Sequence, residues 1–424
     1  MKKLIHITLM MCIPVIRIFG QSDTVTLFQC LTSAQENAVI NSQFDAIDGI
    51  TDLKIANVKA TNLPSLSVYG KAWYQSDAVT VITQAGPGLE IDRFQYNTGL
   101  EADQKLFDGG LARRSKALEM ANQEVEHSRI ETEKYTLNNQ VTDLFFGTLL
   151  SEKSMDVIAL KDTVLTERVK EMESAYLNGV IKRNDLDKLK AELLLMQQQR
   201  LEIEKLHKQT LASLSILTGI ELSEKSGLII EDSIFLIEET RRPEYLYFEA
   251  ETQKIENLAH LQKAQNLPKL FAYGQAGYSY PGLNFFENQS DYYYIVGAKL
   301  AWTIFDWNQT GREAEIIRKQ KDIVETKRED FSQKLEISME KETIEQEKLR
   351  EMICMDEEII SQREMITKGS ANALANGAIT STDYLEDLNA EIKARLDYET
   401  HKLQLQSSIV RQKLLNGIDL DRNL

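Results

Sequence analysis

Two segments of the chain, 92–107 and 291–305, alternate apolar and polar side chains with a period of two, which predicts β-strands. The apolar faces consist of Phe94, Tyr96, Thr98, Leu100, Ala102 and Leu106 in the first, and of Tyr292, Tyr294, Val296, Ala298, Leu300, Trp302 and Ile304 in the second. Segments 65–75 and 269–280 alternate less cleanly, and we expect them to be the partner strands. Each pair is joined by a segment whose Gly and Pro residues break regular structure: 76–91 and 281–290.

Most of the remaining chain has helical patterns. From Leu111 to about Ala175 there is no proline and only one glycine, which predicts about 100 Å of helix at 1.5 Å per residue. In the returning helix a 3-4 spacing from 186 to 217 is apolar at seven of ten positions, which indicates a coiled-coil seam interrupted by Arg200, His207 and Thr210. The second half repeats both helices, with a surface rich in Lys and Glu over 318–350.

An internal repeat organises these elements. Three motifs recur in the same order at offsets of 204, 198 and 198: Asn62-Leu-Pro-Ser-Leu-Ser-Val-Tyr-Gly70 as Asn266-Leu-Pro-Lys-Leu-Phe-Ala-Tyr-Gly274, Leu106-Phe107-Asp108 as Ile304-Phe305-Asp306, and Tyr176-Leu-Asn-Gly-Val-Ile181 as Leu374-Ala-Asn-Gly-Ala-Ile379. We therefore expect a duplicated unit of one helix, two strands, a long helix, a tip turn and a return helix.

The expected organisation has a leader, two repeats, a linker and a tail. The leader is 1–20, the linker 219–242 and the tail 417–424. The first repeat, 21–218, comprises a helix, strands 65–75 and 92–107, long helix 111–175, tip 176–183 and return helix 184–218. The second, 243–416, comprises helix 243–265, strands 269–280 and 291–305, long helix 311–373, tip 374–382 and return helix 383–415.

The N-terminus has the pattern of an export signal. Lys2 and Lys3 precede an apolar stretch over 4–19, and cleavage near Gly20 or Gln21 fits, although Arg17 is unusual there and a buried first helix is the other interpretation. No cysteine follows a lipobox, so no lipid anchor is indicated, and the cysteines are too few for a disulfide framework. After the signal no run of 18 apolar residues follows, so we expect no transmembrane helix.

Composition narrows the function. The net charge of -16 gives no basic surface for nucleic acid, and few glycines and prolines suit long helices. Histidines after the signal are scattered without metal-ligand spacing, and no nucleotide-binding or nucleophile motif occurs. We therefore expect neither catalytic residues nor a cofactor or metal site, and hence no enzyme.

The strand pattern points to a membrane. An apolar-out, polar-in strand of about ten residues is typical of an outer-membrane barrel, and a half-buried strand of a soluble sheet is the alternative. Four strands cannot enclose a lumen, since small barrels need about eight, and an open sheet edge cannot face lipid. A membrane-inserted sheet would therefore have to be completed by other copies of the chain, in a number that the residues do not fix.

Several motifs together resemble the TolC-like outer-membrane factor family over nearly the whole mature chain. They are Asn62-Leu-Pro-Ser-Leu66 after a helix with Ala56 and Ala60, Leu106-Phe107-Asp108-Gly-Gly110, Leu214-Ser-Ile-Leu-Thr-Gly219 and Arg242-Pro243-Glu244. The resemblance implies a mixed α+β membrane protein that forms a homotrimer. It implies a twelve-stranded β-barrel in the Gram-negative outer membrane, in contact with its lipid, and a periplasmic α-barrel of coiled-coil hairpins. The implied function is an exit duct for tripartite efflux or type I secretion.

The resemblance also implies functional positions at the helix tips. Tyr176, Asn178, Gly179 and Ile181, with Asn376, Gly377 and Ile379, match tip turns where a periplasmic adaptor protein docks and links the duct to an RND, ABC or MFS pump of the inner membrane. Asp383 and Glu386 match an acidic ring at the periplasmic aperture, although an ordinary charged helix start explains them equally well. Leu374 and Ile379 depart from the family's Tyr/Arg latch, so that latch cannot be carried over.

Two other classes of protein remain as alternatives. The first is an exported coiled-coil scaffold without a pore, against which the alternating strands and the signal count. The second is a surface hydrolase on a helical stalk, against which the missing catalytic motifs count. The transported substrate is open, since the partner pump would set it.

Overall fold

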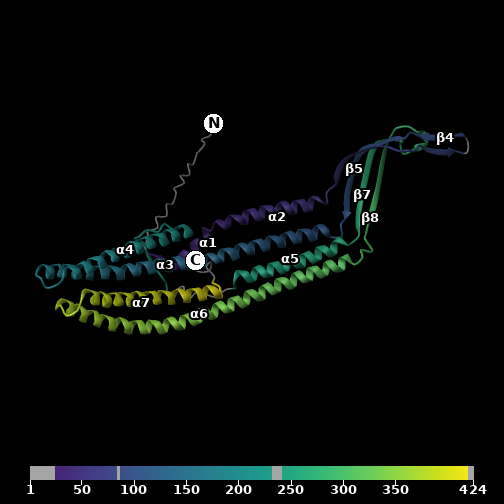
Figure 1. Ribbon diagram of the computed structural model, residues 1–424. Coiled ribbons are helices and arrows are strands. Elements are labelled where there is room, and N and C mark those ends of the chain that lie inside the picture. Colours follow the sequence, from purple (N-terminus) through teal and green to yellow (C-terminus); the bar gives the residue numbers. More distant parts are fainter. Residues whose placement is uncertain (1–23, 84–85, 232–240, 419–424) are drawn as a thin grey trace, which may run out of the picture.

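The computed structural model describes residues 24–83, 86–231 and 241–418. Long helices form an extended body, and a β-sheet continues from one end of it (Figure 1). The expected signal segment lies outside the described residues. Among those residues, no helix has both the length and the apolar character needed to cross a membrane.

The main sheet consists of β2 (Ser65–Tyr74), β5 (Phe94–Phe107), β7 (Lys269–Tyr280) and β8 (Asp291–Ala301), in the antiparallel order β2-β5-β7-β8. Val68, Leu100, Ala276 and Tyr294 are opposite one another across all four strands, so the apolar positions of each strand share one face. The faces predicted from the alternation are therefore confirmed for the paired residues of the strands, but not for Leu106, where the register of β5 shifts.

Two strand predictions were wrong. β8 ends at Ala301 rather than at 305, because its partner β7 begins at Lys269, directly after a proline that cannot donate a backbone hydrogen bond. The segment 76–91 is not a plain linker, because β3 (Val79–Thr83) and β4 (Gly86–Ile91) form a hairpin there. The β-branched run that begins at Val79 outweighs the turn-forming residues Gly86-Pro87-Gly88, which start the second strand.

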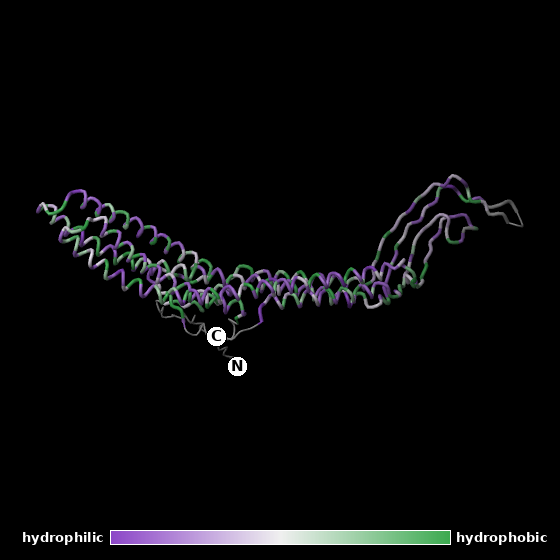
Figure 2. Tube along the Cα trace, turned by 60° about the horizontal axis from the view of Figure 1, so that its bottom comes forward, coloured by the Kyte–Doolittle hydropathy of each residue, from purple (hydrophilic) through white to green (hydrophobic). Residues whose placement is uncertain are grey.

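Two helical hairpins follow the strands. The first is α3 (Leu111–Leu177) with α4 (Arg183–Thr218), and the second is α6 (Gln309–Ala375) with α7 (Ser381–Asn416). The long helices both have 67 residues and the return helices both have 36. Contacts between α3 and α7 join the hairpins side by side, while α2 (Ser42–Ala60) and α5 (Pro243–Gln265) pack along the halves of α3 and α6 nearer the sheet (Figures 1 and 2).

The coiled-coil seam of α4 follows the predicted spacing over its first turns. Leu186, Leu189 and Met196 are buried against α3, and Leu214 is buried near the end. Between them Leu211 is buried in place of the predicted Thr210. A straight α-helix drifts by about 20° per heptad relative to a strict 3.5-residue repeat, so the seam moves by one residue after three heptads.

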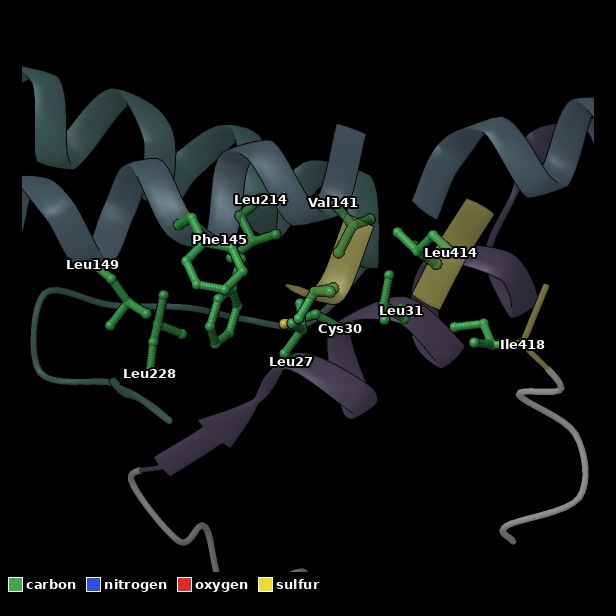
Figure 3. Close-up of a cluster of buried hydrophobic side chains, with 13 residues drawn as sticks. Leu27, Cys30, Leu31, Val141, Phe145, Leu149, Leu214, Leu228, Leu414 and Ile418 are labelled. Atoms are coloured by element: carbon green, nitrogen blue, oxygen red, sulfur yellow. The ribbon is translucent and has the colours of Figure 1, made fainter. Parts of the chain in front are cut away.

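A small core near the middle of the helical body ties the chain together (Figure 3). The short helix α1 (Leu27–Glu36) brings Leu27 and Leu31 against Phe145 of α3, Leu214 of α4 and Leu414 of α7. Next to it, β1 (Thr24–Thr26) pairs in parallel with β6 (Gly227–Ile229), which lies in the segment predicted as a linker. The sequence analysis predicted a single helix before the first strand and did not predict α1 or the pairing of β1 with β6.

Candidate functional site

The apolar face of the main sheet is exposed in the single chain. Val68, Tyr294 and Val296 are each about four-fifths exposed, at 79%, 79% and 81%. The opposite face is polar, and there Gln275 donates a hydrogen bond to Glu101 over 3.0 Å. A contiguous apolar patch of this kind marks a surface that is covered in the functional state.

The height of the apolar face matches a bilayer. The 11 residues of β8 span about 36 Å at roughly 3.3 Å per residue, which a tilt of about 40° reduces to about 28 Å. An outer-membrane barrel presents an apolar band about 25 Å high between two aromatic girdles. Aromatic side chains lie on the face near the loops, at Phe94, Tyr96, Tyr280 and Tyr292. At the other end, Trp302, Phe305 and Trp307 are exposed in the segment between β8 and α6.

The sheet has two open edges, because β2 and β8 each pair on one side only among the described strands. β2 follows directly after α2, and β8 leads directly to α6. Unpaired strand edges need a partner, most of all where water is absent. The geometry therefore leaves two complementary edges for further strands.

A tyrosine bridge crosses the polar face of the sheet. Tyr69 of β2 and Tyr293 of β8 hydrogen-bond through their hydroxyls, and the hydroxyl of Tyr293 also donates to Asn97 over 2.7 Å. Gly99 and Gly277 occupy the two strands between them in the same row. The rings can lie across the sheet only because these two positions have no side chain.

Adding a methyl group at Gly277 should therefore destabilise the sheet. The new Cβ of Gly277→Ala would come 2.6 Å from the carbonyl oxygen of Thr98 and 3.0 Å from the ring of Tyr293, an overpacking that costs about 1–3 kcal/mol. Urea unfolding in detergent micelles should show a lower midpoint. Gly274→Ala is the control, because its nearest contact is at 4.0 Å. Equal midpoints for the two variants would contradict the bridge.

The second part of the site is the far end of the hairpins. At both tips a glycine with positive φ, Gly179 at 73° and Gly377 at 68°, follows a capping asparagine, Asn178 or Asn376. The amide after each glycine bonds a carbonyl five residues back, and the glycine amide bonds a carbonyl three residues back, which is the Schellman motif that favours glycine. The two tips have the same backbone hydrogen-bonding pattern.

The structure places the predicted tip residues in two groups. Tyr176, Asn178 and Gly179 on the first tip, and Asn376 and Gly377 on the second, are exposed. The isoleucines that follow each turn, Ile181 and Ile379, pack against the core inside the tip instead. The two tips lie at the same end of the molecule (Figure 1), and Lys188 of α4 donates a hydrogen bond to Thr382 of α7 over 2.7 Å.

The two predicted ring carboxylates occupy the first turns of α7. Asp383 forms a capping box with Thr380, whose amide and hydroxyl donate to the carboxylate over 2.9 Å and 2.8 Å. These hydrogen bonds hold the pKa of Asp383 below its ordinary value, so it is ionised at neutral pH. Glu386 is exposed three residues later, and this spacing places both carboxylates on one side of the helix.

A buried tyrosine joins the hairpins near the tips. Tyr384 is 1% exposed and lies in a core with Leu374 of α6, Leu388 of α7 and Met172 and Leu189 of the first hairpin. The guanidinium of Arg168 lies 5.2 Å from the centre of its ring, a favourable cation–π geometry. Burial raises the pKa of Tyr384, so the ring stays neutral. The sequence analysis missed this residue, although it lies between the two predicted ring carboxylates.

Comparison with known proteins identifies the fold. The Campylobacter jejuni outer membrane channel CmeC matches with a TM-score of 0.64 at 14% identity, over 94% of this chain and 87% of CmeC. The outer membrane protein VceC of Vibrio cholerae gives 0.66 at 12% identity, over 93% and 97%. CusC, a protein described in terms of transmembrane channel formation, gives 0.69 at 13% identity, over 93% and 92%. No protein-family model and no curated protein sequence matches the chain.

The fold is that of the TolC-like outer-membrane factors. The match extends over sheet and helices together, since it covers more than nine-tenths of the chain. At 12–14% identity most side chains differ from those of the similar proteins. This chain therefore forms the same fold with core residues of its own.

Proposed function

We propose that the chain is one subunit of a trimeric exit duct of the Gram-negative outer membrane, serving tripartite efflux or type I secretion. The observation that carries the proposal is the four-stranded sheet with an exposed apolar face, a polar opposite face and two open edges. Lipid covers the apolar face, and neighbouring copies pair with the edges. The similarity in fold to CmeC and VceC supports the same conclusion.

Three copies would give twelve strands, enough for a barrel with an aqueous lumen. Because β2 and β8 are the outer strands, the β8 of one copy pairs with the β2 of the next, and this brings α2 of one copy beside α6 of its neighbour. The hairpins, each about 100 Å long at 1.5 Å per residue, extend the barrel into a helical tube through the periplasm. Equal helix lengths in the two halves support a duplicated unit.

Light scattering of the detergent-solubilised protein tests the copy number. We expect a particle of more than one chain, because the open edges of a single sheet must be paired, and of three chains, because the resemblance to the TolC-like family implies a trimer. A monodisperse monomer with an intact sheet by circular dichroism would contradict the proposal and favour the scaffold without a pore.

At the tips, the duct meets its partners. The exposed residues Tyr176, Asn178 and Gly179 of the first tip, with Asn376 and Gly377 of the second, form the surface for a periplasmic adaptor, which couples the duct to an inner-membrane pump of RND, ABC or MFS type. Ile181 and Ile379 support the turns from inside. The chain itself performs no catalysis and needs no cofactor, since the pump supplies the driving force.

The carboxylates of Asp383 and Glu386 form the aperture ring in this proposal. Three copies of both would concentrate cations at the opening, so millimolar Mg²⁺ should block the conductance of the wild type. The double variant Asp383→Ala/Glu386→Ala should need about tenfold more Mg²⁺ for the same block.

The matched control for the ring removes two exposed carboxylates elsewhere, in Glu351→Ala/Glu358→Ala on α6. This variant should keep the Mg²⁺ sensitivity of the wild type. Equal sensitivity in all three proteins would reject the ring and leave Asp383 with its capping role alone.

A further inference from the structure

The apolar face of the sheet contains a hollow of about 640 Å³ in the half of the strands nearer the loops. The backbone at Gly99, Gly277 and Tyr293 forms its floor. These three residues form one row whose side-chain positions point to the polar face, so no side chain of this row enters the hollow. The walls are outward side chains of the two adjacent rows: Val68, Thr98, Leu100, Ala276, Tyr278, Tyr292 and Tyr294. The hollow is a shallow depression that is open toward the surroundings of the face.

The chemistry of the hollow is apolar with a hydroxyl rim. None of its lining residues is charged. The rings of Tyr278 and Tyr292 contact each other with centroids 4.8 Å apart. Within the described chain, the hydroxyls of Tyr278, Tyr292 and Tyr294 form no hydrogen bond, whereas the hydroxyl of Tyr293 on the other face forms two. A tyrosine with an apolar body and a free hydroxyl suits the boundary between acyl chains and polar lipid groups.

We propose that this hollow binds one acyl chain of a membrane lipid, whose ester oxygens accept hydrogen bonds from the tyrosine hydroxyls. The proposal rests on the proposed function, which places the apolar face in the bilayer. The hollow is continuous with that face, which favours an acyl chain over a protein partner. The absence of lining charge gives no site for a headgroup phosphate, so the contact is with the chain and its ester.

Native mass spectrometry tests the site with dimyristoylphosphatidylcholine as the added lipid. After detergent washing, the wild type should retain about one lipid per chain. Ala276→Phe fills the hollow and should lower the retained lipid at least about fivefold. Ala298→Phe is the matched control, because it adds the same ring to the same face outside the hollow, and it should retain as much lipid as the wild type.

A second variant tests the site independently, in case Ala276→Phe does not fold. Tyr292→Phe/Tyr294→Phe keeps the rings and removes two hydroxyls, and it should retain about two- to threefold less lipid than the wild type. Flotation with dimyristoylphosphatidylcholine vesicles is measured alongside. A wild type that floats and retains no lipid after washing would overturn the site and leave the duct intact, as would equal retention by Ala276→Phe. A wild type that does not float would overturn both proposals.

Discussion

Replacing Tyr384 by alanine should loosen the end of the proposed duct that is formed by the hairpin tips. The ring is buried between both hairpins beneath Arg168, and removal of a buried aromatic side chain costs about 3–5 kcal/mol. The expected result is a several-fold larger conductance and faster tryptic cleavage after Lys182 and Arg183, which are exposed in the first tip. Single-channel recording and limited proteolysis measure the two effects.

Two variants control this experiment. Tyr384→Phe keeps the packing and should remain closed. Tyr398→Ala removes a half-buried tyrosine farther along α7, which bonds Glu357 over 3.1 Å outside the tip core, and it should change neither readout. If Tyr384→Ala leaves both conductance and cleavage at the wild-type level, the tip core does not hold the aperture closed.

Introducing a charge at Val296 should prevent membrane insertion. Val296 is the central residue of β8 and is exposed on the apolar face. An arginine on the lipid face of an outer-membrane barrel costs about 2–4 kcal/mol per site at the bilayer midplane, and a trimer would contain three. We expect Val296→Arg to lose flotation with lipid vesicles and to form no trimer.

Ile295→Arg is the matched control, because the preceding residue lies on the polar face, opposite Gln275. This variant should insert and assemble, with its guanidinium in the lumen near Glu101. Comparing Val296→Arg with Ile295→Arg distinguishes the membrane duct from the scaffold without a pore. If the sheet were exposed to water, an arginine at position 296 would be tolerated better than the native valine. Normal assembly of Val296→Arg would contradict the membrane-facing assignment.

Local patterns carried much of the fold. Alternation assigned the faces of β5 and β8 because each strand is solvated differently on its two sides. Long stretches without proline or glycine predicted α3 and α6, because nothing in them interrupts the backbone hydrogen bonds. The ends of the strands could not be predicted where the neighbouring strand decides them. β8, for example, ends at Ala301 because β7 begins at the opposite residue, Lys269.

Features that depend on tertiary contacts were missed. The burial of α1 follows from its contacts with α3 and α7, which no local periodicity encodes. The pairing of β1 with β6 joins segments about 200 residues apart and is equally invisible in the local pattern. Tyr384 was hidden for the same reason, since its helix pattern does not reveal the four-helix core around it. Of the expected tip residues, Ile181 and Ile379 turned inward because each follows a Schellman turn and begins the return path beside that core.

Single-channel recording in a planar lipid bilayer tests the central claim most directly. Purified trimers of the wild type should give small, cation-selective conductance steps, and Tyr384→Ala should give larger steps through the same pore. The proposed carboxylate ring would make the pore selective for cations, and a tip core that holds the proposed aperture closed would keep the steps small. Trimers that insert into the bilayer and conduct no ions, in both the wild type and Tyr384→Ala, would contradict the exit duct.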